Sequence, residues 1–371
     1  MFNLYLLLQI SLDISSADSF PLLGETAWQD IKDAAEKHAI IGVVWGGIEK
    51  LPLEKQPPRH MKLTWMADAE IIKKRNMKMD KACVKIVRIL EKMGLPSVIL
   101  KGQAIAKLYP NPYYRTSGDI DALILPQYLI AEYGDIDHSV KPVRKKIQAL
   151  GKGVIDKKIV YHHTTWRFSD VEIEVHHRSM QLNSPAQNKA YQQWAKGIKT
   201  VPCGEYNTAD VEYNLVFMLA HIYHHLLFEG VGLRQVCDYA VLLQAVAKEY
   251  SGKEERQKLF CRVNEQISAC KMTRFLTGLM WIMQTVFALP SEMLMAKPDE
   301  TIGRFIMKEI EQAGNFGQHD ERIRHERLSS VVGKFIERTK HRMRFLQLFP
   351  EEILWDIPFR LWHYIWRVRY T

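Results

Sequence analysis

Two aspartates one residue apart carry the strongest chemical signal in this chain. Asp119 and Asp121 flank Ile120 and lead into an apolar run. On an extended strand, residues i and i+2 point to the same face, so the two carboxylates repel each other unless a positive charge sits between them. Magnesium is the usual such charge, because it prefers hard oxygen ligands and is held by a carboxylate or two plus substrate phosphates. The spacing therefore predicts a divalent-cation site.

Residues on both sides of this pair suit the same chemistry. Lys101 and Gly102 form a turn after the apolar run 97–100, and Arg115 precedes the aspartates. A strand, a glycine turn and a helix N-terminus present backbone N–H groups to an anion. Glu174 lies on the polar face of an alternating strand, where it supplies a third carboxylate. Phosphoryl and nucleotidyl transfer need this combination of carboxylates and a phosphate-binding turn.

The order of these motifs resembles that of a known family. The chain reads Leu-Lys-Gly at 100–102, Leu-Tyr-Pro at 108–110, Arg115, Gly-Asp-Ile-Asp at 118–121 and Glu-Val-His at 174–176. This pattern is similar to that of an uncharacterised bacterial nucleotidyltransferase family, within the superfamily that includes DNA polymerase beta. Segments 232–238 and 314–317 also resemble family signatures, so the likeness covers most of the chain.

The resemblance implies a metal-dependent enzyme. It would move a nucleoside monophosphate from a nucleoside triphosphate, ATP among them, to an acceptor and release pyrophosphate, with Mg²⁺ or Mn²⁺ as cofactor. The implied catalytic and metal-binding residues are Asp119, Asp121 and Glu174. The implied triphosphate-binding residues are Lys101, Gly102, Arg115, Ser117, Gly118 and His176. The motifs leave the acceptor open among a small molecule, a protein and RNA.

Two other classes of function stay open. One is a toxin-like nucleotidyltransferase that modifies tRNA or other RNA, which the net charge of +9 permits because polyanions favour basic proteins. The other is a non-catalytic nucleotide-binding or scaffold protein. Salt-sensitive RNA binding favours the first, and triphosphate binding without turnover favours the second.

Several site residues have an alternative structural role. Arg115 is either a phosphate clamp or the ion-pair partner of one of the two aspartates, and Lys101 either contacts phosphate or only ends a strand. His176 orients a ligand or is a packed, hydrogen-bonded histidine. Glu172, on the same face as Glu174, is a fallback third carboxylate. Gln103 stands where the superfamily has serine or glycine, which removes a hydroxyl expected near the phosphates.

Later helical segments contain further polar residues. His221 and His225 have the i, i+4 spacing of zinc ligands, with His224 beside them, but we favour a polar helix face that lines a cleft. Arg234 and Asp238 have the same spacing, and we expect a structural ion pair between them, with nucleotide binding as the second interpretation.

Basic runs are expected to lie on solvated helix faces, among them Arg338 to Arg344. The last segment, Trp355 to Tyr370, mixes arginines with aromatic residues. Such a mixture binds single-stranded nucleic acid in some proteins. A terminal helix that packs its aromatic side chains into the core is the commoner arrangement, and we expect it here.

Hydrophobic periodicity predicts the elements that hold the site. Helices are expected over residues 1 to about 95, 103–109 and 145–150, and again from about 210 onward. Strands are expected over 97–100 and 119–125, and a hairpin over 159–168 and 171–177 with its turn at Ser169 and Asp170. The fold class is therefore α+β, with a small mixed sheet of nucleotidyltransferase type at 96–180. Helical regions flank it at 1–95 and 181–371.

Composition limits the setting of the protein. The 371 residues are 47% hydrophobic, which is typical of a globular protein. The five cysteines form no Cys-x-x-Cys pair, which favours a reducing, cytoplasmic compartment over a zinc ribbon or a disulfide framework. The apolar N-terminus lacks a basic region before Lys32, so we expect a core-facing helix and not a signal peptide. No apolar run reaches the length of a membrane span.

Overall fold

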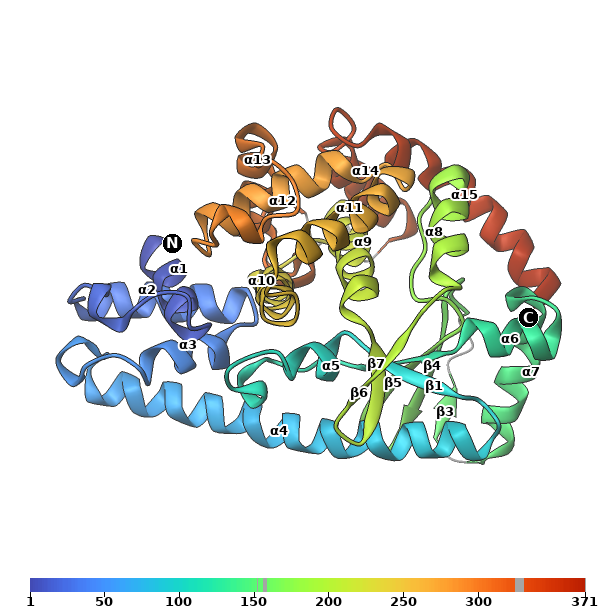
Figure 1. Ribbon diagram of the computed structural model, residues 1–371, viewed down its shortest axis with the longest axis horizontal. Helices are drawn as coiled ribbons and strands as arrows, with labels where there is room; N and C mark the ends of the chain where they lie inside the picture. The colour runs from blue at the N-terminus through green and yellow to red at the C-terminus, as the bar shows by residue number, and fades with distance from the viewer. Residues whose placement is uncertain (152, 156–158, 324–329, 371) are drawn as a thin grey trace.

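A five-stranded mixed sheet carries the acidic residues of the sequence analysis (Figure 1). The computed structural model describes residues 1–151, 153–155, 159–323 and 330–370. The strand order is β1-β2-β5-β4-β3, in which β2 and β5 are parallel and the other pairs are antiparallel. The strands are β1 (Ser97–Leu100), β2 (Ile120–Ile124), β3 (Val154–Ile155), β4 (His163–Phe168) and β5 (Val171–His176).

Helices precede, interrupt and follow this sheet, and with it they confirm the α+β class. The N-terminal helices are α1 (Phe2–Ser11), α2 (Glu25–Lys37), α3 (Ile41–Ile48) and α4 (Arg59–Lys92). Those between the strands are α5 (Gly102–Ala106), α6 (Pro126–Tyr133) and α7 (Ile136–Ala149). After the sheet come α8 (Pro185–Ala195), the hairpin β6 (Thr200–Cys203) and β7 (Tyr206–Ala209), α9 (Val211–Phe228), α10 (Leu233–Glu249), α11 (Lys253–Ala269), α12 (Thr273–Thr285), α13 (Glu300–Ala313), α14 (Val331–Met343) and α15 (Pro350–Tyr370).

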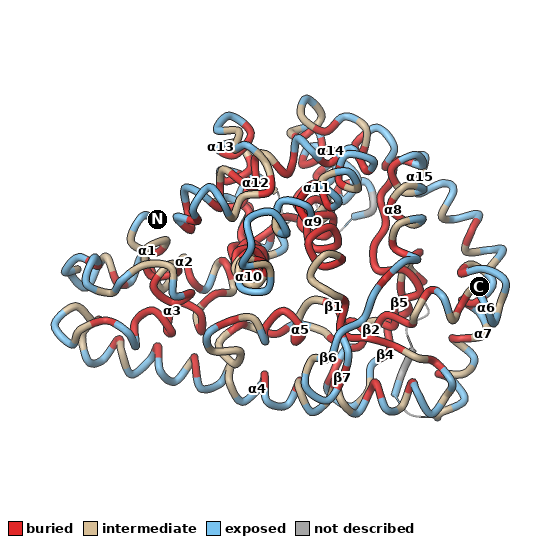
Figure 2. Tube along the Cα trace, viewed as in Figure 1, coloured by how far each residue is buried: buried red, intermediate tan, exposed pale blue. Residues whose placement is uncertain are grey.

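The two faces of the sheet differ because side chains alternate along each strand. Ile120, Ala122, Ile173 and Val175 lie on one face and share a hydrophobic core with the long helix α4. In Figure 2 the buried residues of α4 line the side that faces the sheet, and its other side is exposed. The opposite face of the sheet, near its centre, is polar. Apolar packing on one face thus fixes the acidic residues on the other.

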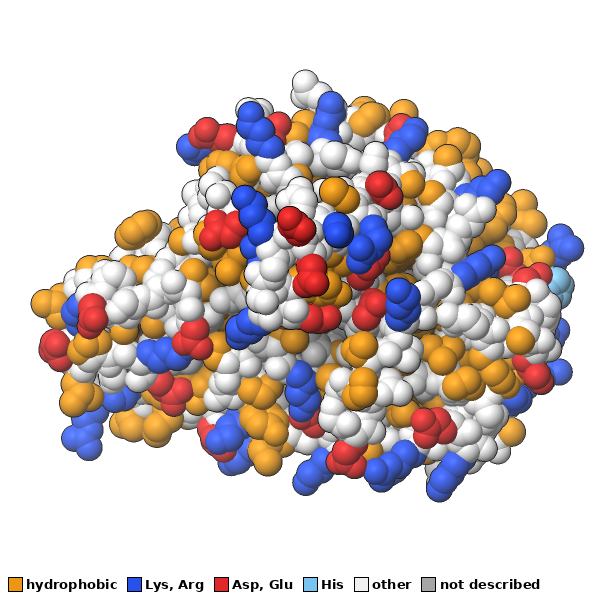
Figure 3. Space-filling model, in the orientation of Figure 1, with side chains coloured by type: hydrophobic (Ala, Val, Ile, Leu, Met, Phe, Trp, Pro, Cys, Tyr) orange, Lys and Arg blue, Asp and Glu red, His pale blue; other side chains and the backbone are white. Residues whose placement is uncertain are grey.

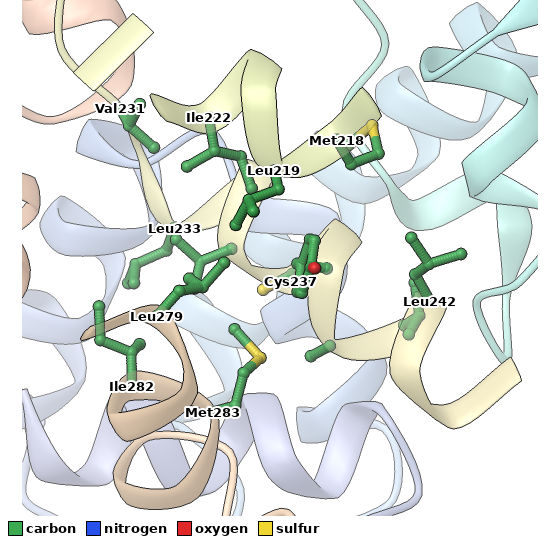
Figure 4. Close-up of a cluster of buried hydrophobic side chains, with 14 of the residues drawn as sticks. Met218, Leu219, Ile222, Val231, Leu233, Cys237, Leu242, Leu279, Ile282 and Met283 are labelled. Atoms are coloured by element: carbon green, nitrogen blue, oxygen red, sulfur yellow. The ribbon is translucent and has the colours of Figure 1, made fainter. Parts of the chain in front are cut away.

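A second hydrophobic core holds the C-terminal helices together. Side chains of α9, α10 and α12 interlock around Leu219, Cys237 and Met283 (Figure 4). The first helix joins the same core through Leu4, Leu7 and other buried residues, which confirms the expected core-facing helix. The five cysteines are free, in agreement with the absence of a disulfide framework. Among the described residues, no helix has both the length and the apolar character needed to cross a membrane.

Sequence periodicity located some elements well and missed others. The strand 97–100 and the hairpin turn at Ser169 and Asp170 are confirmed. The expected strand from residue 159 begins only at His163, because the chain before it packs against α15 and does not pair with β5. The helix expected at 145–150 begins at Ile136, where the Asp135 carboxylate caps it by accepting from the His138 N–H at 2.8 Å. Helices α6 and α8 and the β6–β7 hairpin were not predicted.

The C-terminal helix departs from the expected packing. Trp366 is buried against Tyr161, as predicted for a core-packing helix. Trp355, Trp362 and Tyr364 are exposed, so the expectation is wrong for these three residues. Figure 2 shows α15 largely exposed along its length. The alternation of aromatic and basic residues places one face of the helix toward the interior and leaves the other uncovered.

One buried ion pair joins the loop before β2 to the helical region. The Arg115 guanidinium donates to both carboxylate oxygens of Asp238 on α10, at 2.7 and 2.8 Å. The Tyr109 hydroxyl donates to the same carboxylate at 2.7 Å. Burial alone lowers the pKa of Arg115, but Asp238 outweighs burial and raises it. Two predictions are corrected here, because Arg115 pairs with neither Asp119 nor Asp121 and Asp238 pairs with Arg115 instead of Arg234.

We expect Asp238→Asn to destabilise the protein by about 3–5 kcal/mol, because it leaves the buried Arg115 guanidinium without a compensating charge. Urea unfolding monitored by circular dichroism measures this change. Glu212→Gln is the matched control, since Glu212 pairs with the half-exposed Arg262, and such surface pairs contribute about 1 kcal/mol or less. Equal losses in the two variants would contradict the structural role of the buried pair.

Acid should destabilise the protein through His38. This residue ends α2 and is buried, and burial, with Lys37 and His319 nearby, lowers its pKa to about 4. The unfolded chain, with a histidine pKa near 6.5, therefore binds more protons between pH 6.5 and pH 4, so stability falls as the pH falls through this window. We expect His38→Gln to reduce the slope of unfolding free energy against pH by up to about 1.4 kcal/mol per pH unit. Urea unfolding at several pH values measures the slope, and unchanged slopes would contradict the prediction.

Candidate functional site

Strand pairing brings two of the predicted carboxylates together. Asp121 of β2 lies directly opposite Glu174 of the parallel strand β5, so both side chains are on the polar face of the sheet. Asp119 stands just before β2 and, two residues from Asp121, lines the same cavity. The cavity measures about 780 Å³ and is bounded by the sheet, α9, α14 and α15. Alternation along the chain before and within β2, together with the pairing of β2 with β5, therefore brings Asp119 and Glu174 to one cavity, although they are 55 positions apart in the sequence.

Two cationic side chains compensate the buried carboxylates. The Lys101 ammonium lies 3.0 Å from Asp121 Oδ1. Burial lowers the pKa of Lys101, but Asp121, Asp119 and Glu174 together raise it above its usual value. His176 Nε2 lies 2.9 Å from Asp121 Oδ1 and 3.2 Å from Glu174 Oε2. Burial would likewise lower the pKa of His176, whereas these two hydrogen bonds raise it to about 9.

Glu174 keeps its negative charge in this environment. Burial raises the pKa of its carboxyl group, and the His176 hydrogen bond and the Lys101 charge outweigh burial, so the net shift is downward. His163 of β4 adds a further contact, with its Nε2 3.3 Å from Glu174 Oε1. A carboxylate with a lowered pKa is a good cation ligand and a weak proton acceptor.

The donor set fits a divalent cation. Asp121, Glu174 and His176 each offer one atom within 4.8 Å of the others. Asp121 Oδ2 is buried and has no hydrogen-bond partner among the described residues, so one carboxylate oxygen remains for a ligand. Oxygen donors suit Mg²⁺. The His176 imidazole, which also suits Mn²⁺, becomes a ligand only when it loses the proton that its raised pKa favours. Asp119 is outside this group, although its side chain lines the same cavity.

Most of the predicted triphosphate-binding residues line the cavity. Lys101, Gly102, Arg115, Gly118 and His176 do so. The turn is strained at Lys101, a non-glycine residue with φ of 32°, and Gly102 follows it with φ of 39°. Helix α5 after this turn has only five residues, so its dipole contributes little to anion binding. Ser117 is buried, and its hydroxyl has no partner among the described residues, but it does not line the cavity.

Two polar residues near the site point elsewhere. Gln103, in the position where the superfamily has a smaller residue, donates to Asp80 Oδ1 and to the Asn76 carbonyl, away from the cavity. Glu172 lies on the same strand face as Glu174 but is exposed and pairs with Arg167 at the surface. The fallback assignment of Glu172 as third carboxylate is therefore wrong.

The histidines of α9 form part of the cavity wall. His221, His224 and His225 line it, as predicted for a polar helix face. The Lys101 ammonium donates to His221 Nε2 at 3.1 Å, and burial with the nearby Lys101 charge lowers the pKa of His221. Among the described residues, the groups of close metal donors are the acidic one at Asp121 and a trio of His162, His163 and His176. No α9 histidine belongs to either, which supports the wall interpretation.

Arg234 has a different environment from the one predicted. It is 8% exposed, and its guanidinium donates to the Thr116 carbonyl at 3.1 Å. Its Nε has no hydrogen-bond partner among the described residues, and burial lowers its pKa to about 10. The guanidinium carbon lies 5.7 Å from the ring centre of Phe316, another residue of the cavity wall. Arg234 is therefore a buried, charged side chain that lines the cavity and keeps one donor, Nε, without a partner among the described residues.

The opposite wall of the cavity was not predicted from the sequence. Arg338 and Arg342 of α14 and Arg360 of α15 line it, although the basic run containing the first two was expected to be solvated. Arg342 is in fact 5% exposed. The available signal was the spacing of Arg338 and Arg342, which puts both on one face of a helix.

Comparison with known proteins identifies the family of this chain. The chain belongs to a family of uncharacterised nucleotidyltransferases, whose model matches residues 24–288. The protein is thus a transferase of the nucleotidyltransferase class with a nucleotide substrate. The predicted resemblance is confirmed, while the expected late signature at 314–317 lies outside the matched range.

A solved structure is also similar to this chain. It is the crystal structure of an antigenic nucleotidyltransferase-like protein from Paracoccidioides brasiliensis, with 14% identity and a TM-score of 0.27. The match covers 52% of this chain and 91% of that one. This identity is too low to transfer residue roles. No curated protein matches the chain.

We expect Glu174→Gln to weaken Mn²⁺ binding roughly tenfold or more, since even residues that only support metal ligands contribute 10–100-fold. Titration with Mn²⁺, followed by the electron paramagnetic resonance signal of the free ion, measures the affinity. Glu172→Gln is a matched control, because Glu172 lies on the same strand face and is exposed. Equal affinities for the two variants would remove Glu174 from the cation site.

Proposed function

We propose that this protein transfers a nucleoside monophosphate from a nucleoside triphosphate to an acceptor hydroxyl or similar group. The acceptor oxygen attacks the α-phosphorus, the bond from that phosphorus to the bridging oxygen of the β-phosphate breaks, and pyrophosphate leaves. The acceptor proton passes to solvent or a nearby base. The observation that carries the proposal is the pairing of Asp121 with Glu174 beside Lys101, with one buried Asp121 oxygen free to bind a ligand.

Asp119, Asp121 and Glu174 are the residues that would hold a divalent cation. Bound there, Mg²⁺ or Mn²⁺ supplies positive charge to the triphosphate and to the leaving pyrophosphate. Lys101 and His176 already compensate these carboxylates in the chain alone. Their positions next to Asp121 support the proposal, because a protein that transfers phosphate groups acts mainly by placing compensating charges around them.

The chain's own residues position the triphosphate. The turn at Lys101 and Gly102, with Gly118 opposite, leaves room for phosphate oxygens, since a side chain on Gly102 would have its nearest neighbour only at the Asp119 carbonyl, 3.7 Å away. Arg234 offers guanidinium donors to the same space. Arg115 is committed to Asp238, so its part is to hold the loop that carries Asp119 and not to clamp phosphate. Glu174, with its lowered pKa, acts as a ligand more than as a base.

We expect Asp119→Asn, Asp121→Asn and Glu174→Gln each to lower transfer by about 10²–10³-fold, the size of effect seen when one charge-stabilising group is removed. The assay incubates the protein with a nucleoside triphosphate labelled at the α-phosphate, Mg²⁺ or Mn²⁺ and a cell extract. Label in a new product, with one pyrophosphate released per label, measures the reaction, and mass spectrometry identifies the acceptor.

Two outcomes would contradict the proposal. Transfer at the wild-type rate in the double variant Asp119→Ala/Asp121→Ala would exclude these carboxylates. Transfer of a γ-phosphate label in place of the α-label would show a phosphoryl transferase. Glu172→Gln, exposed and away from the cavity, is the control for handling of the variants.

A further inference from the structure

The cavity continues well past the carboxylates toward α14 and α15. Its far wall is lined by Arg338, Arg342, Asp356, Phe359, Arg360, His363 and Arg367. In Figure 1 these two helices lie at the C-terminal end of the chain, above the sheet. A volume of about 780 Å³ lies toward the upper end of the range for small-molecule sites, so the cavity has room for more than a nucleotide.

This wall has an excess of positive charge. Arg342 Nη1 lies 2.6 Å from Asp356 Oδ2, and Arg360 Nε donates to Asp356 Oδ1 at 3.0 Å. Arg338 lies one helical turn before Arg342 and is exposed. Two guanidinium groups, those of Arg342 and Arg360, therefore share the Asp356 carboxylate, and Arg338 adds a further positive charge to the same wall. Of the cavity-lining residues on α14 and α15 that the structure describes, Asp356 is the acidic one.

Arg342 is the buried member of this group, whereas Arg338 and Arg360 are exposed. It is 5% exposed, and its Nε has no hydrogen-bond partner among the described residues. Its pKa falls to about 10, chiefly through burial and also through Arg360 and Arg338, with Asp356 opposing the shift. The side chain thus stays charged at neutral pH. Asp356 compensates its charge but leaves the buried Nε donor without an acceptor, which a bound anion would supply.

The arginine wall is separate from the carboxylate end of the cavity. Helix α9 connects the two, because its His221 contacts Lys101 and its Phe228 ring lies 5.5 Å from the Arg342 guanidinium carbon. Seven residues separate His221 from Phe228, which is about 10 Å along a helix at 1.5 Å per residue. A single phosphate group beside Asp121 is smaller than this rise, so we assign an anion at the wall to a second group.

Because the donor triphosphate is assigned to the carboxylate end, we propose that Arg338, Arg342 and Arg360 bind a phosphate group of the acceptor. This inference rests on the proposed function and extends it to the acceptor, which is a phosphorylated molecule. Guanidinium groups suit this task, since they offer paired donors to phosphate oxygens. The phosphate belongs either to a small phosphorylated metabolite or to an RNA end, and the same wall serves both.

The test measures donor and acceptor binding separately by isothermal titration calorimetry of the full chain. The donor probe is a non-hydrolysable nucleoside triphosphate analogue with Mg²⁺. The acceptor probes are ribose 5-phosphate and a short single-stranded RNA with a 5′-phosphate, each with its dephosphorylated form. The variants are Arg338→Gln/Arg360→Gln, both partly exposed, and Arg342→Gln. Arg304→Gln on α13 is the control, because Arg304 is exposed, pairs with Glu300 and does not line the cavity.

We expect one phosphorylated probe to bind the wild type, and its affinity to fall at least about tenfold in Arg338→Gln/Arg360→Gln, as for lost charge-assisted hydrogen bonds. Affinity for the triphosphate analogue should stay within about twofold, and Asp121→Asn should show the reverse pattern. Preference for ribose 5-phosphate identifies a metabolite acceptor, and preference for the phosphorylated RNA identifies an RNA end.

The proposal is overturned if neither phosphorylated probe binds the wild type, or if the arginine variants bind the probe like Arg304→Gln. It is also overturned if the arginine variants lower the affinity for the triphosphate analogue as much as the affinity for the probe, because the wall would then bind the donor. A further outcome separates the two proposals. If the arginine variants lose probe binding and Asp121→Asn binds the triphosphate analogue as the wild type does, the acceptor site is supported and the proposed donor site is contradicted.

Discussion

Placing two carboxylates side by side inside a sheet is the constraint on which the rest of this structure depends. The parallel register of β2 and β5 sets Asp121, which is 1% exposed, opposite Glu174. Like charges at that separation are tolerated in a low-dielectric interior only when cations accompany them. Lys101 comes from the turn after β1 and His176 from the end of β5, so the sheet itself delivers both compensating charges.

The same requirement explains how the helical region is attached. Asp238 is buried on α10 and is compensated by Arg115, with Tyr109 as a third member. This pair fixes the loop that ends at Asp119, and therefore the entry to β2. Arg234, one turn earlier on α10, has no carboxylate partner in the described part of the chain. It lines the cavity, where its Nε has no hydrogen-bond partner among the described residues.

Charge is distributed differently on the surface and in the cavity. Figure 3 shows acidic and basic side chains interspersed over one face, which is consistent with ordinary solvated helices. Inside the cavity, the carboxylates on the sheet are accompanied by Lys101, whereas arginines outnumber the one acidic residue, Asp356, among the described lining residues of α14 and α15. The net charge of +9 suggested an anionic partner without locating it. The cavity gives such a partner a location, because Lys101, Arg234 and the arginines of α14 and α15 all line it.

The sequence by itself determined the local parts of the site. Alternation in 171–176 put Glu174 and His176 on one face, a glycine turn followed the strand 97–100, and the Asp-x-Asp spacing placed Asp119 and Asp121 together, because these features depend only on neighbouring residues. Tertiary structure alone decided that Arg115 pairs with Asp238, that Glu172 is exposed and that Arg342 faces the cavity. Those outcomes depend on which helix packs over which strand, between segments that can be more than 100 residues apart. The periodicity of one segment predicts its own secondary structure and not the distant segment that it contacts.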